Sequence, residues 1–225
     1  KTYNNILFTS LHFEKDNPNF YLSKAKEFRS SLKPIADQLL LKYQYDDKPK
    51  KLKIGFVSAD LREHPVGFFL LDTLKYLSSK NLELIAYSNS SKKDGLSDKL
   101  KSYFTNWREV STQNDVKLTN QIRKDGIHIL FDLSGHSGKN RLPIFINRPA
   151  PIQVSWAGYN ASTGIPEIDY FIGDPIVTPA SENSHYVEKI FQLPNIWVCF
   201  TAPDFEARLS QLSAIKNGYI TFGCF

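Results

Sequence analysis

The chain has 225 residues, of which 41% are hydrophobic, 23% charged and 13% aromatic. This composition is typical of a globular protein with a sizeable core, and it excludes the disordered, collagen-like and disulfide-rich classes. Lys and Arg outnumber Asp and Glu by 28 to 23, but the only basic cluster, at 48–53, is too short for a nucleic-acid-binding surface. The apolar runs at 67–71 and 127–131 are far shorter than the ~20 residues of a membrane-spanning helix. We therefore expect neither nucleic acid nor a membrane as a partner.

The cysteines and the first residues of the chain bear on its compartment. Cys199 and Cys224 have no CxxC spacing and no neighbouring histidine pattern, so neither a zinc site nor a disulfide framework is predicted. A reducing, cytoplasmic compartment fits this cysteine usage. The chain starts at Lys1 without a basic-then-apolar leader, so we expect no signal peptide and a chain that is part of a longer protein.

The first fifty residues have helical character. Apolar residues recur at helical spacing through 3–45, and the turn signal Asp-Asn-Pro at 16–18 interrupts them, so two or three helices are predicted. The segment 46–51 is charged and contains a proline, which is typical of a linker. We therefore divide the chain into a helical connector at 1–50 and a second domain at 51–225.

Beyond the linker, short apolar strands alternate with amphipathic helices. Strands are predicted at 52–58, 82–87, 107–110, 127–131, 152–156, 170–172 and 219–225. Helices are predicted at 66–77, 97–104, 116–124 and 141–147, with a short one at 205–212. Repeated βα units favour a parallel sheet that is covered on both faces. The predicted fold class is α/β, with a Rossmann-like parallel sheet of six or seven strands preceded by a short helical segment.

In a sheet of this kind, ligands bind outside the carboxyl ends of the strands, but the common motifs are missing from those loops. The first turn lacks GxGxxG, because it offers no glycine between Gly55 and Gly67. The run from Gly135 to Lys139 is too short for a P-loop, and Asn140 follows the lysine where Ser or Thr is needed. Neither a GxSxG elbow nor an HExxH motif occurs. Hydride transfer, P-loop NTPase activity and the common hydrolase classes are therefore disfavoured.

Two histidines, His64 and His136, follow strands that should be neighbours in such a sheet. A neutral imidazole is a suitable base for taking a proton from a hydroxyl at cellular pH. Alternatively, each histidine caps a helix N-terminus or bonds a backbone carbonyl. Asp60 and Asp132 can orient these histidines or bind a substrate hydroxyl, or they can be simple N-caps. His128 lies in a predicted strand and is expected to be a core or sheet-edge residue.

Several segments together resemble one known family. The segments KIGFVSADLREHPV, DGIHILFDLSGHSGKNRL, NRPAPIQVSWAGYNASTGIPEIDYFIGD, EKIFQLP and YITFGCF follow one another over about residues 50–225. In this order they resemble the catalytic region of the O-GlcNAc transferase and SPINDLY family of protein O-glycosyltransferases. The first fifty residues resemble the connector that joins such a region to an upstream tetratricopeptide array.

This resemblance implies the B fold of glycosyltransferases, in which two Rossmann-like lobes face each other across a cleft. The chain would be the N-terminal lobe, and the donor-binding second lobe would be absent, so we expect the chain to be inactive alone. His64 matches the histidine of the family's DF-x-x-HP segment, with Leu61 in place of the phenylalanine, and is the candidate catalytic residue. The candidate substrate-binding residues are Asp60, Pro65, Asp132, Gly135, His136, Gly158, Tyr159, Thr163 and Gly164.

The implied reaction is a single displacement with inversion, in which a Ser or Thr hydroxyl of a protein attacks the anomeric carbon and a nucleoside diphosphate leaves. Helix N-termini and basic groups would stabilise the leaving group, so no metal cofactor is expected. The nucleotide sugar is expected to be a substrate. UDP-GlcNAc is the favoured donor. GDP-fucose is the alternative, because DLSGHSGKNRL resembles the SPINDLY branch. A non-catalytic binding lobe and a transferase with a small-molecule acceptor are the remaining interpretations.

Overall fold

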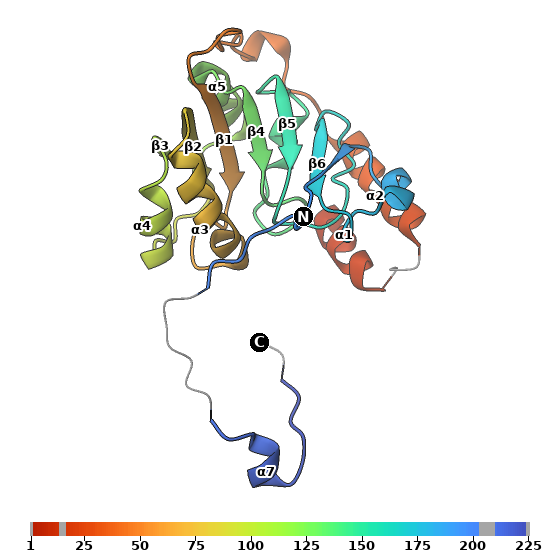
Figure 1. The fold of residues 1–225 in the computed structure, drawn as a ribbon. Coiled ribbons are helices and arrows are strands. Elements are labelled where there is room, and N and C mark those ends of the chain that lie inside the picture. The colour runs from red at the N-terminus through yellow and green to blue at the C-terminus, as the bar shows by residue number, and fades with distance from the viewer. Residues whose placement is uncertain (1, 14–16, 203–209, 224–225) are drawn as a thin grey trace.

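The computed structural model describes residues 2–13, 17–202 and 210–223, within which the chain forms a seven-stranded parallel sheet (Figure 1). The strands are β1 (Leu52–Ser58), β2 (Leu82–Ser88), β3 (Asn106–Glu109), β4 (Ile129–Asp132), β5 (Ile152–Ser155), β6 (Tyr170–Gly173) and β7 (Lys189–Gln192). They lie in the order β3-β2-β1-β4-β5-β6-β7, and every neighbouring pair is parallel. The α/β sheet expected from the sequence is confirmed.

The strand order reverses at the centre of the sheet, between β1 and β4. The chain proceeds from β1 to β2 and β3 on one side, and from β4 to β7 on the other. The register places Val57 of β1 beside Asp132 of β4, so the two strands end at the same level. Ligand sites of doubly wound sheets lie at such a switch point, because the loops that leave the two strands diverge there.

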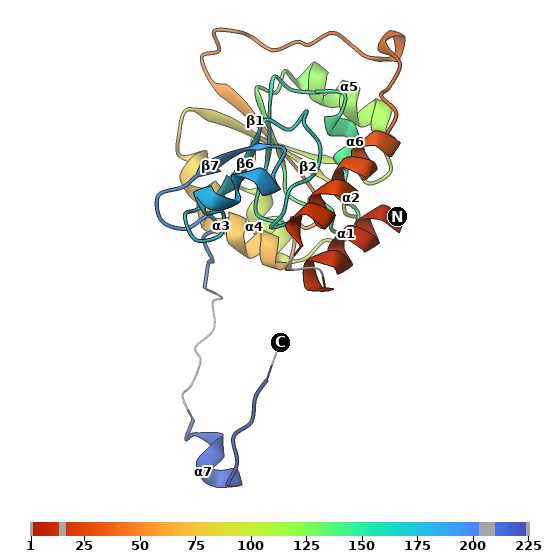
Figure 2. The ribbon, with the colours of Figure 1, turned by 90° about the vertical axis from the view of Figure 1, so that its right-hand side faces the viewer.

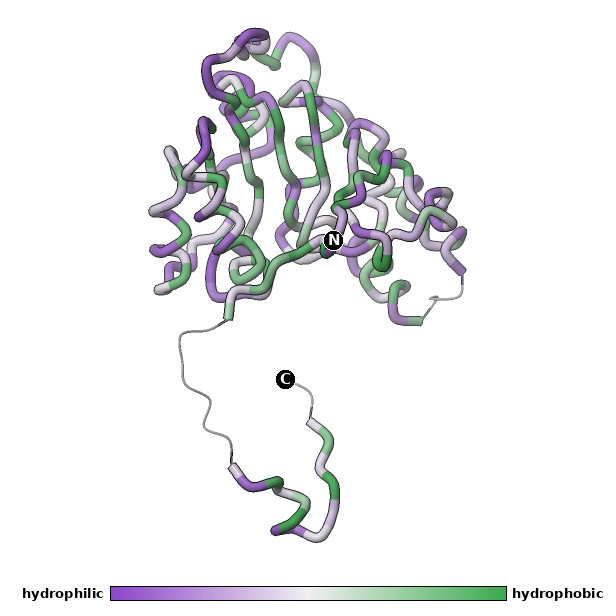
Figure 3. The backbone as a smooth tube through the Cα atoms, viewed as in Figure 1, coloured by the Kyte–Doolittle hydropathy of each residue, from purple (hydrophilic) through white to green (hydrophobic). Residues whose placement is uncertain are grey.

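Helices cover both faces of the sheet. The helices of the described residues are α1 (Thr2–Phe13), α2 (Pro18–Ser31), α3 (Pro65–Ser78), α4 (Gly95–Lys101), α5 (Asp115–Asp125), α6 (Leu142–Phe145) and α7 (Ser213–Asn217), with 3₁₀ turns at Asp37–Leu39 and Ala180–His185; α7 lies apart from the sheet. Neighbouring residues of β1 reach opposite faces: Phe56 belongs to a core cluster with residues of α3 and α4, and Val57 to a cluster with residues of α1, α2, α5 and α6. Figure 2 shows the two N-terminal helices on the same side as α5 and α6. Hydrophobic stretches follow the central strands in Figure 3.

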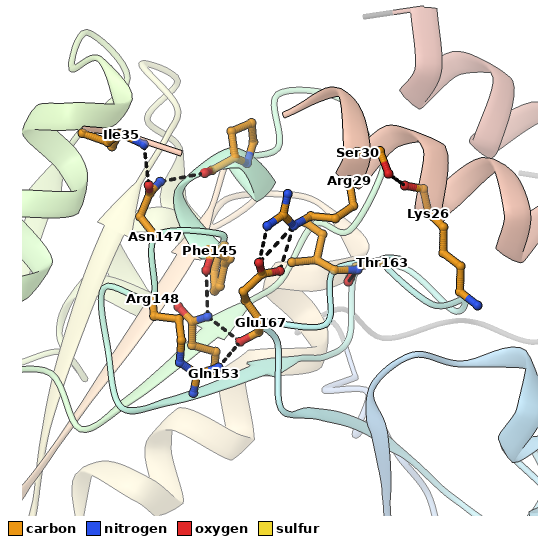
Figure 4. A network of polar contacts seen from close by, with 12 residues as sticks. Lys26, Arg29, Ser30, Ile35, Phe145, Asn147, Arg148, Gln153, Thr163 and Glu167 are labelled. Carbon is orange, nitrogen blue, oxygen red and sulfur yellow. Dashed lines mark hydrogen bonds and ion pairs between the residues drawn. The ribbon is translucent and has the colours of Figure 1, made fainter. Parts of the chain in front are cut away.

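The N-terminal helices are joined to the sheet domain by buried apolar contacts and by a polar network (Figure 4). Arg29 of α2 donates two hydrogen bonds from Nε to the carboxylate of Glu167, the shorter of 2.9 Å. The side-chain amide of Gln153 donates to the carbonyl oxygens of Phe145 and Glu167, at 2.9 and 2.7 Å. Leu7 of α1 is fully buried in the core shared with the sheet. The domain boundary near residue 50 stays a prediction, but the two segments share one core.

Most predicted elements are found within a few residues of the expected positions, with differences at the end of the chain. The strand β7 was missed, because its side chains are mostly exposed and it therefore lacks a run of core residues. The strand predicted at 219–225 is wrong for 219–223, where exposed backbone pairs with no other strand; residues 224–225 lie outside the described residues. Of the helix predicted at 205–212, residues 205–209 also lie outside them, and 210–212 are not helical.

Residues 210–223 extend away from the sheet domain in both Figure 1 and Figure 2, and they include the short helix α7. Ile215, Ile220 and Phe222 are largely exposed to solvent. Within the described ranges, no helix has both the length and the apolar character needed to cross a membrane.

Candidate functional site

The loop between β1 and α3 forms around a helix N-terminus. His64 is the N-cap of α3, where its Nδ1 accepts a hydrogen bond from the amide of Val66 at 3.3 Å. Pro65 occupies the first helical position, where its fixed φ and missing N–H are tolerated. Gly67 allows the turn to be tight, since a Cβ there would lie 2.2 Å from the carbonyl oxygen of Arg62. The capping alternative considered for His64 is thus confirmed, and its ring is 36% exposed.

A paired carboxylate lies near the ring of His64. Asp60 is buried, and its Oδ1 lies 3.1 Å from Nη2 of Arg62 and 3.8 Å from Nε2 of His64. The amide of Asp60 itself bonds Oγ of Ser58, the last residue of β1, at 2.9 Å. Three residues further along the loop, the amide of Glu63 donates to Oδ2 of Asp94 at 2.9 Å. The loop therefore has a fixed backbone, with one half-exposed imidazole beside a buried carboxylate.

The loop after β4 is ordered by the buried carboxylate of Asp132. This carboxylate accepts hydrogen bonds from the amides of Ser134 and Gly135, at 3.2 and 2.8 Å. Burial raises the pKa of Asp132 to about 6. Gly135 has a positive φ of 50° and lies against Tyr159, where a Cβ would come within 2.3 Å of the tyrosine Cβ. Asp132 and Gly135 together fix the conformation of this turn.

His136 is buried and fully engaged. Its Nε2 donates to the carbonyl oxygen of Thr163 at 2.8 Å, whereas its Nδ1 lies 3.0 Å from Oδ1 of Asn4 in α1, a contact without a donor when the single ring proton is on Nε2. The ring also packs edge-on against Phe28 and Tyr159. Burial lowers the pKa of His136 to about 4, so the ring is neutral at cellular pH. The carbonyl-bonding alternative is confirmed for this residue.

The loop after β5 connects the sheet to α2 and to the segment before β7. Gly158 lies so close to Leu133 that a Cβ would come within 1.8 Å of its carbonyl oxygen. The hydroxyl of Tyr159 lies 3.2 Å from that of Tyr21 in α2. Thr163 bonds the carboxylate of Glu188 through its amide, at 2.8 Å, and through its hydroxyl.

Gly164, next in this loop, has a φ of 71° and approaches the backbone of Ala25 in α2. Glu188 is almost completely buried, and this burial raises its pKa. The carboxylate of Glu188 also accepts a hydrogen bond from Oγ of Ser162, at 2.7 Å. These residues thus fix the loop in place. Substrate binding by the candidate residues of this loop stays a prediction.

Comparison with known proteins identifies the family from most of the chain. Residues 35–214 match the glycosyl transferase family 41. The chain belongs to this family. A SPINDLY protein of Petunia hybrida, named a probable UDP-N-acetylglucosamine–peptide N-acetylglucosaminyltransferase, is 34% identical over 183 residues, 80% of this chain and 20% of its own length. The UDP-N-acetylglucosamine–peptide N-acetylglucosaminyltransferase of Caenorhabditis elegans is 30% identical over 65% of this chain and 13% of its own.

Among solved structures, a mutant O-GlcNAc transferase of Thermobaculum terrenum matches the family 41 chain with a TM-score of 0.75 and 35% identity. The match covers 84% of this chain and 36% of that one. The family and fold implied by the sequence motifs are therefore confirmed. The chain spans about a fifth of the length of the plant SPINDLY proteins that it matches.

The candidate residues of this family 41 chain fall into two groups. Asp60, His64 and Pro65 lie together in the loop after β1, whereas His136, Tyr159 and Thr163 lie together beneath the N-terminal helices. A hollow of about 530 Å³ opens beside His136 of the second group, between α1 and the loop after β4. Its wall includes Asn4 and Phe8 of α1 and residues 136–139.

Three polar residues of the site were not found from the sequence. Arg62 pairs with Asp60, but its position in a turn carries no signal of that contact. Asp94 forms a capping box with Ser97, a three-residue spacing that sequence alone could have indicated. Glu188 meets Thr163 only through the fold. Within the described residues, no three His, Cys, Asp or Glu side chains come together as a metal-binding group.

Proposed function

We propose that the chain is the N-terminal, acceptor-side lobe of an inverting glycosyltransferase that moves N-acetylglucosamine from UDP-GlcNAc onto Ser or Thr hydroxyls of proteins. Membership of family 41 and the names of the matching relatives support transfer of a sugar to a peptide. The observation that supports a location for the reaction is the half-exposed ring of His64. It lies at the end of the central strand β1, at the switch point of the sheet.

In this proposal the acceptor hydroxyl approaches the carboxyl edge of the sheet near His64, and its oxygen forms a bond to the anomeric carbon. The bond between that carbon and the diphosphate oxygen breaks, the nucleoside diphosphate leaves with the electron pair, and the proton of the acceptor hydroxyl passes to an oxygen of the departing diphosphate or to solvent. The N-terminus of α3 contributes positive electrostatic potential at this place, because the peptide dipoles of the helix are aligned with their positive ends towards it. We propose that no metal cofactor takes part, and that the reaction occurs in the cytoplasm.

The proposal assigns most of the donor contacts to a second lobe outside this chain. The chain alone is then expected to transfer no sugar, although it folds around its own core. A protein O-fucosyltransferase that uses GDP-fucose is the second candidate. It rests on the segment around His136, which resembles the SPINDLY branch, whereas the six SPINDLY relatives that match are named probable N-acetylglucosaminyltransferases.

The test is a transfer assay on the complete protein, with UDP-GlcNAc and GDP-fucose offered separately to a lysate of the same cell. Mass spectrometry of Ser- and Thr-containing peptides distinguishes the sugars, since N-acetylglucosamine adds ~203 Da and fucose ~146 Da. A gain of ~203 Da supports the proposal, and ~146 Da supports the second candidate. No addition from either donor contradicts protein O-glycosylation. The 225-residue chain is assayed alone as a control, which tests whether transfer requires a second lobe.

A further inference from the structure

The hydrogen bond at the start of α3 determines which nitrogen of His64 carries a proton. The amide of Val66 can only donate, so Nδ1, which lies 3.3 Å from it, must present a lone pair. In the neutral ring the single proton then sits on Nε2. Phe68, one turn into the helix, bonds its amide to the carbonyl of His64 at 3.2 Å, which fixes the capping backbone.

The proton-bearing Nε2 has no hydrogen-bond partner among the described residues. Oδ1 of Asp60 lies 3.8 Å away, beyond hydrogen-bond distance, and that carboxylate is already paired with Arg62 at 3.1 Å. The ring is partly exposed at the carboxyl edge of the sheet. An N–H donor is therefore free to meet an oxygen atom that arrives from outside.

This arrangement is poorly suited to a general base. Nε2 already holds a proton and cannot accept another, and protonation of Nδ1 would break its bond with the amide of Val66. A neutral imidazole held at a helix N-terminus is instead suited to donate a hydrogen bond to an oxygen on which charge develops.

We propose that His64 takes part as a hydrogen-bond donor through Nε2, to a phosphate or hydroxyl oxygen of the substrates, and does not take the acceptor's proton. This inference rests on the proposed function, since it assigns the role of His64 in that reaction. In the protein without substrates, the ring of His64 then carries its proton on Nε2.

The tautomer can be measured by NMR on the 225-residue chain labelled with ¹⁵N-histidine. Two other rings calibrate the result. His12 has Nδ1 at 3.0 Å from the carbonyl of Phe8 and must carry its proton there, whereas the Nδ1 of His128 accepts from the amide of Lys53 at 3.0 Å. We expect His64 to give the pattern of His128. The pattern of His12 at His64 would overturn the inference.

Three substitutions in the complete protein separate the possible roles, with kcat and KM as readouts. In His64→Gln the side-chain amide can reach the position of Nε2 but no longer caps the helix, whereas in His64→Asn it caps but does not reach. His64→Ala does neither. A donor role predicts that Gln retains kcat within roughly tenfold, while Asn and Ala lose roughly 10²- to 10³-fold. Thermal stability should follow a different order, with Asn above Gln and Ala.

The other outcomes are distinct. Equal, large losses of kcat in all three variants would indicate a general base and overturn the inference, with the proposed function intact. Recovery by Asn but not by Gln would show that only the cap matters, and would also overturn it. If the unsubstituted complete protein transfers neither sugar, the proposed function itself fails.

Discussion

His64 and His136 each follow the end of a central strand, in loops of similar polarity, yet the structure treats them differently. The ring of His64 is 36% exposed, and its one hydrogen bond to a described residue is with the amide of Val66, whereas His136 is 1% exposed and contacts α1, Phe28 and Thr163. The difference arises because α1 and α2 cover the loop after β4 and leave the loop after β1 open. Position after a strand therefore indicates a possible site, and the covering helices decide which loop can meet a substrate.

The comparison predicts opposite effects for the two histidines. In the complete protein, His64→Ala should lower turnover by roughly 10²-fold or more, with a loss of about 1 kcal/mol in unfolding free energy from the missing cap. His136→Ala should instead cost about 3 kcal/mol, because it leaves the carbonyl of Thr163 unpaired and opens a cavity. Transfer kinetics and thermal unfolding of both variants measure this. Equal turnover in wild type and His64→Ala would remove His64 from the reaction.

The close packing of the loop after β4 can be tested with two of its glycines. Gly135→Ala should lower the unfolding free energy by about 3 kcal/mol, because of the positive φ and the contact with Tyr159. Gly138, in the same loop, is exposed and has no atom within 4 Å of the position of a Cβ. Gly138→Ala should therefore change stability by less than about 0.5 kcal/mol. Similar denaturant midpoints for the two variants would show that the loop is not held as described.

The buried state of His136 predicts a pH effect on stability. Its pKa is about 4 in the folded chain against 6.5 for a free side chain, so the unfolded chain binds more protons between these values. The contribution is present above pH 6.5 and is lost as the pH falls towards 4. Relative to His136→Gln, the wild type should lose about 3 kcal/mol over this range.

The comparison of wild type with His136→Gln is needed because other buried groups act in the opposite direction. The pKa values of Asp132, about 6, and of Glu188 are raised by burial, so their contributions are lost as the pH rises. These groups are present in both proteins and cancel in the difference. Urea unfolding at several pH values measures it, and parallel curves for the two proteins would contradict a neutral buried His136.

The smallest expected effect on stability comes from removing the ion pair that attaches α2 to the sheet domain. Arg29→Ala removes a partly buried, bidentate ion pair with Glu167 and should cost about 1 kcal/mol. Lys24, in the same helix, pairs with Glu27 at the surface, so Lys24→Ala should cost less than about 0.5 kcal/mol. Thermal unfolding distinguishes the two. Equal costs would mean that α2 is held by its apolar face alone.

Local patterns in the sequence were sufficient for most strands and helices of the sheet domain, with β7 the exception. The run of apolar residues at 52–58 coincides with β1, and the sequence His-Pro at 64–65 is found at the start of α3. The edge strand β7 and the end of the chain were not predicted correctly, because an exposed edge strand lacks the apolar pattern and 219–223 lacks a partner strand. For the site, the histidines were found but not their different environments.

The sequence by itself determined the alternation of strands and helices, the family motifs and the two loops in which polar chemistry is concentrated, because these depend on residues close together in the chain. Only the tertiary structure decided that His136 is covered by α1 and α2, that Glu188 holds Thr163, and that Nε2 of His64 has no hydrogen bond to a described residue. These properties depend on contacts between segments far apart in the chain. Their geometry follows from how the helices pack on the sheet, which no local pattern specifies.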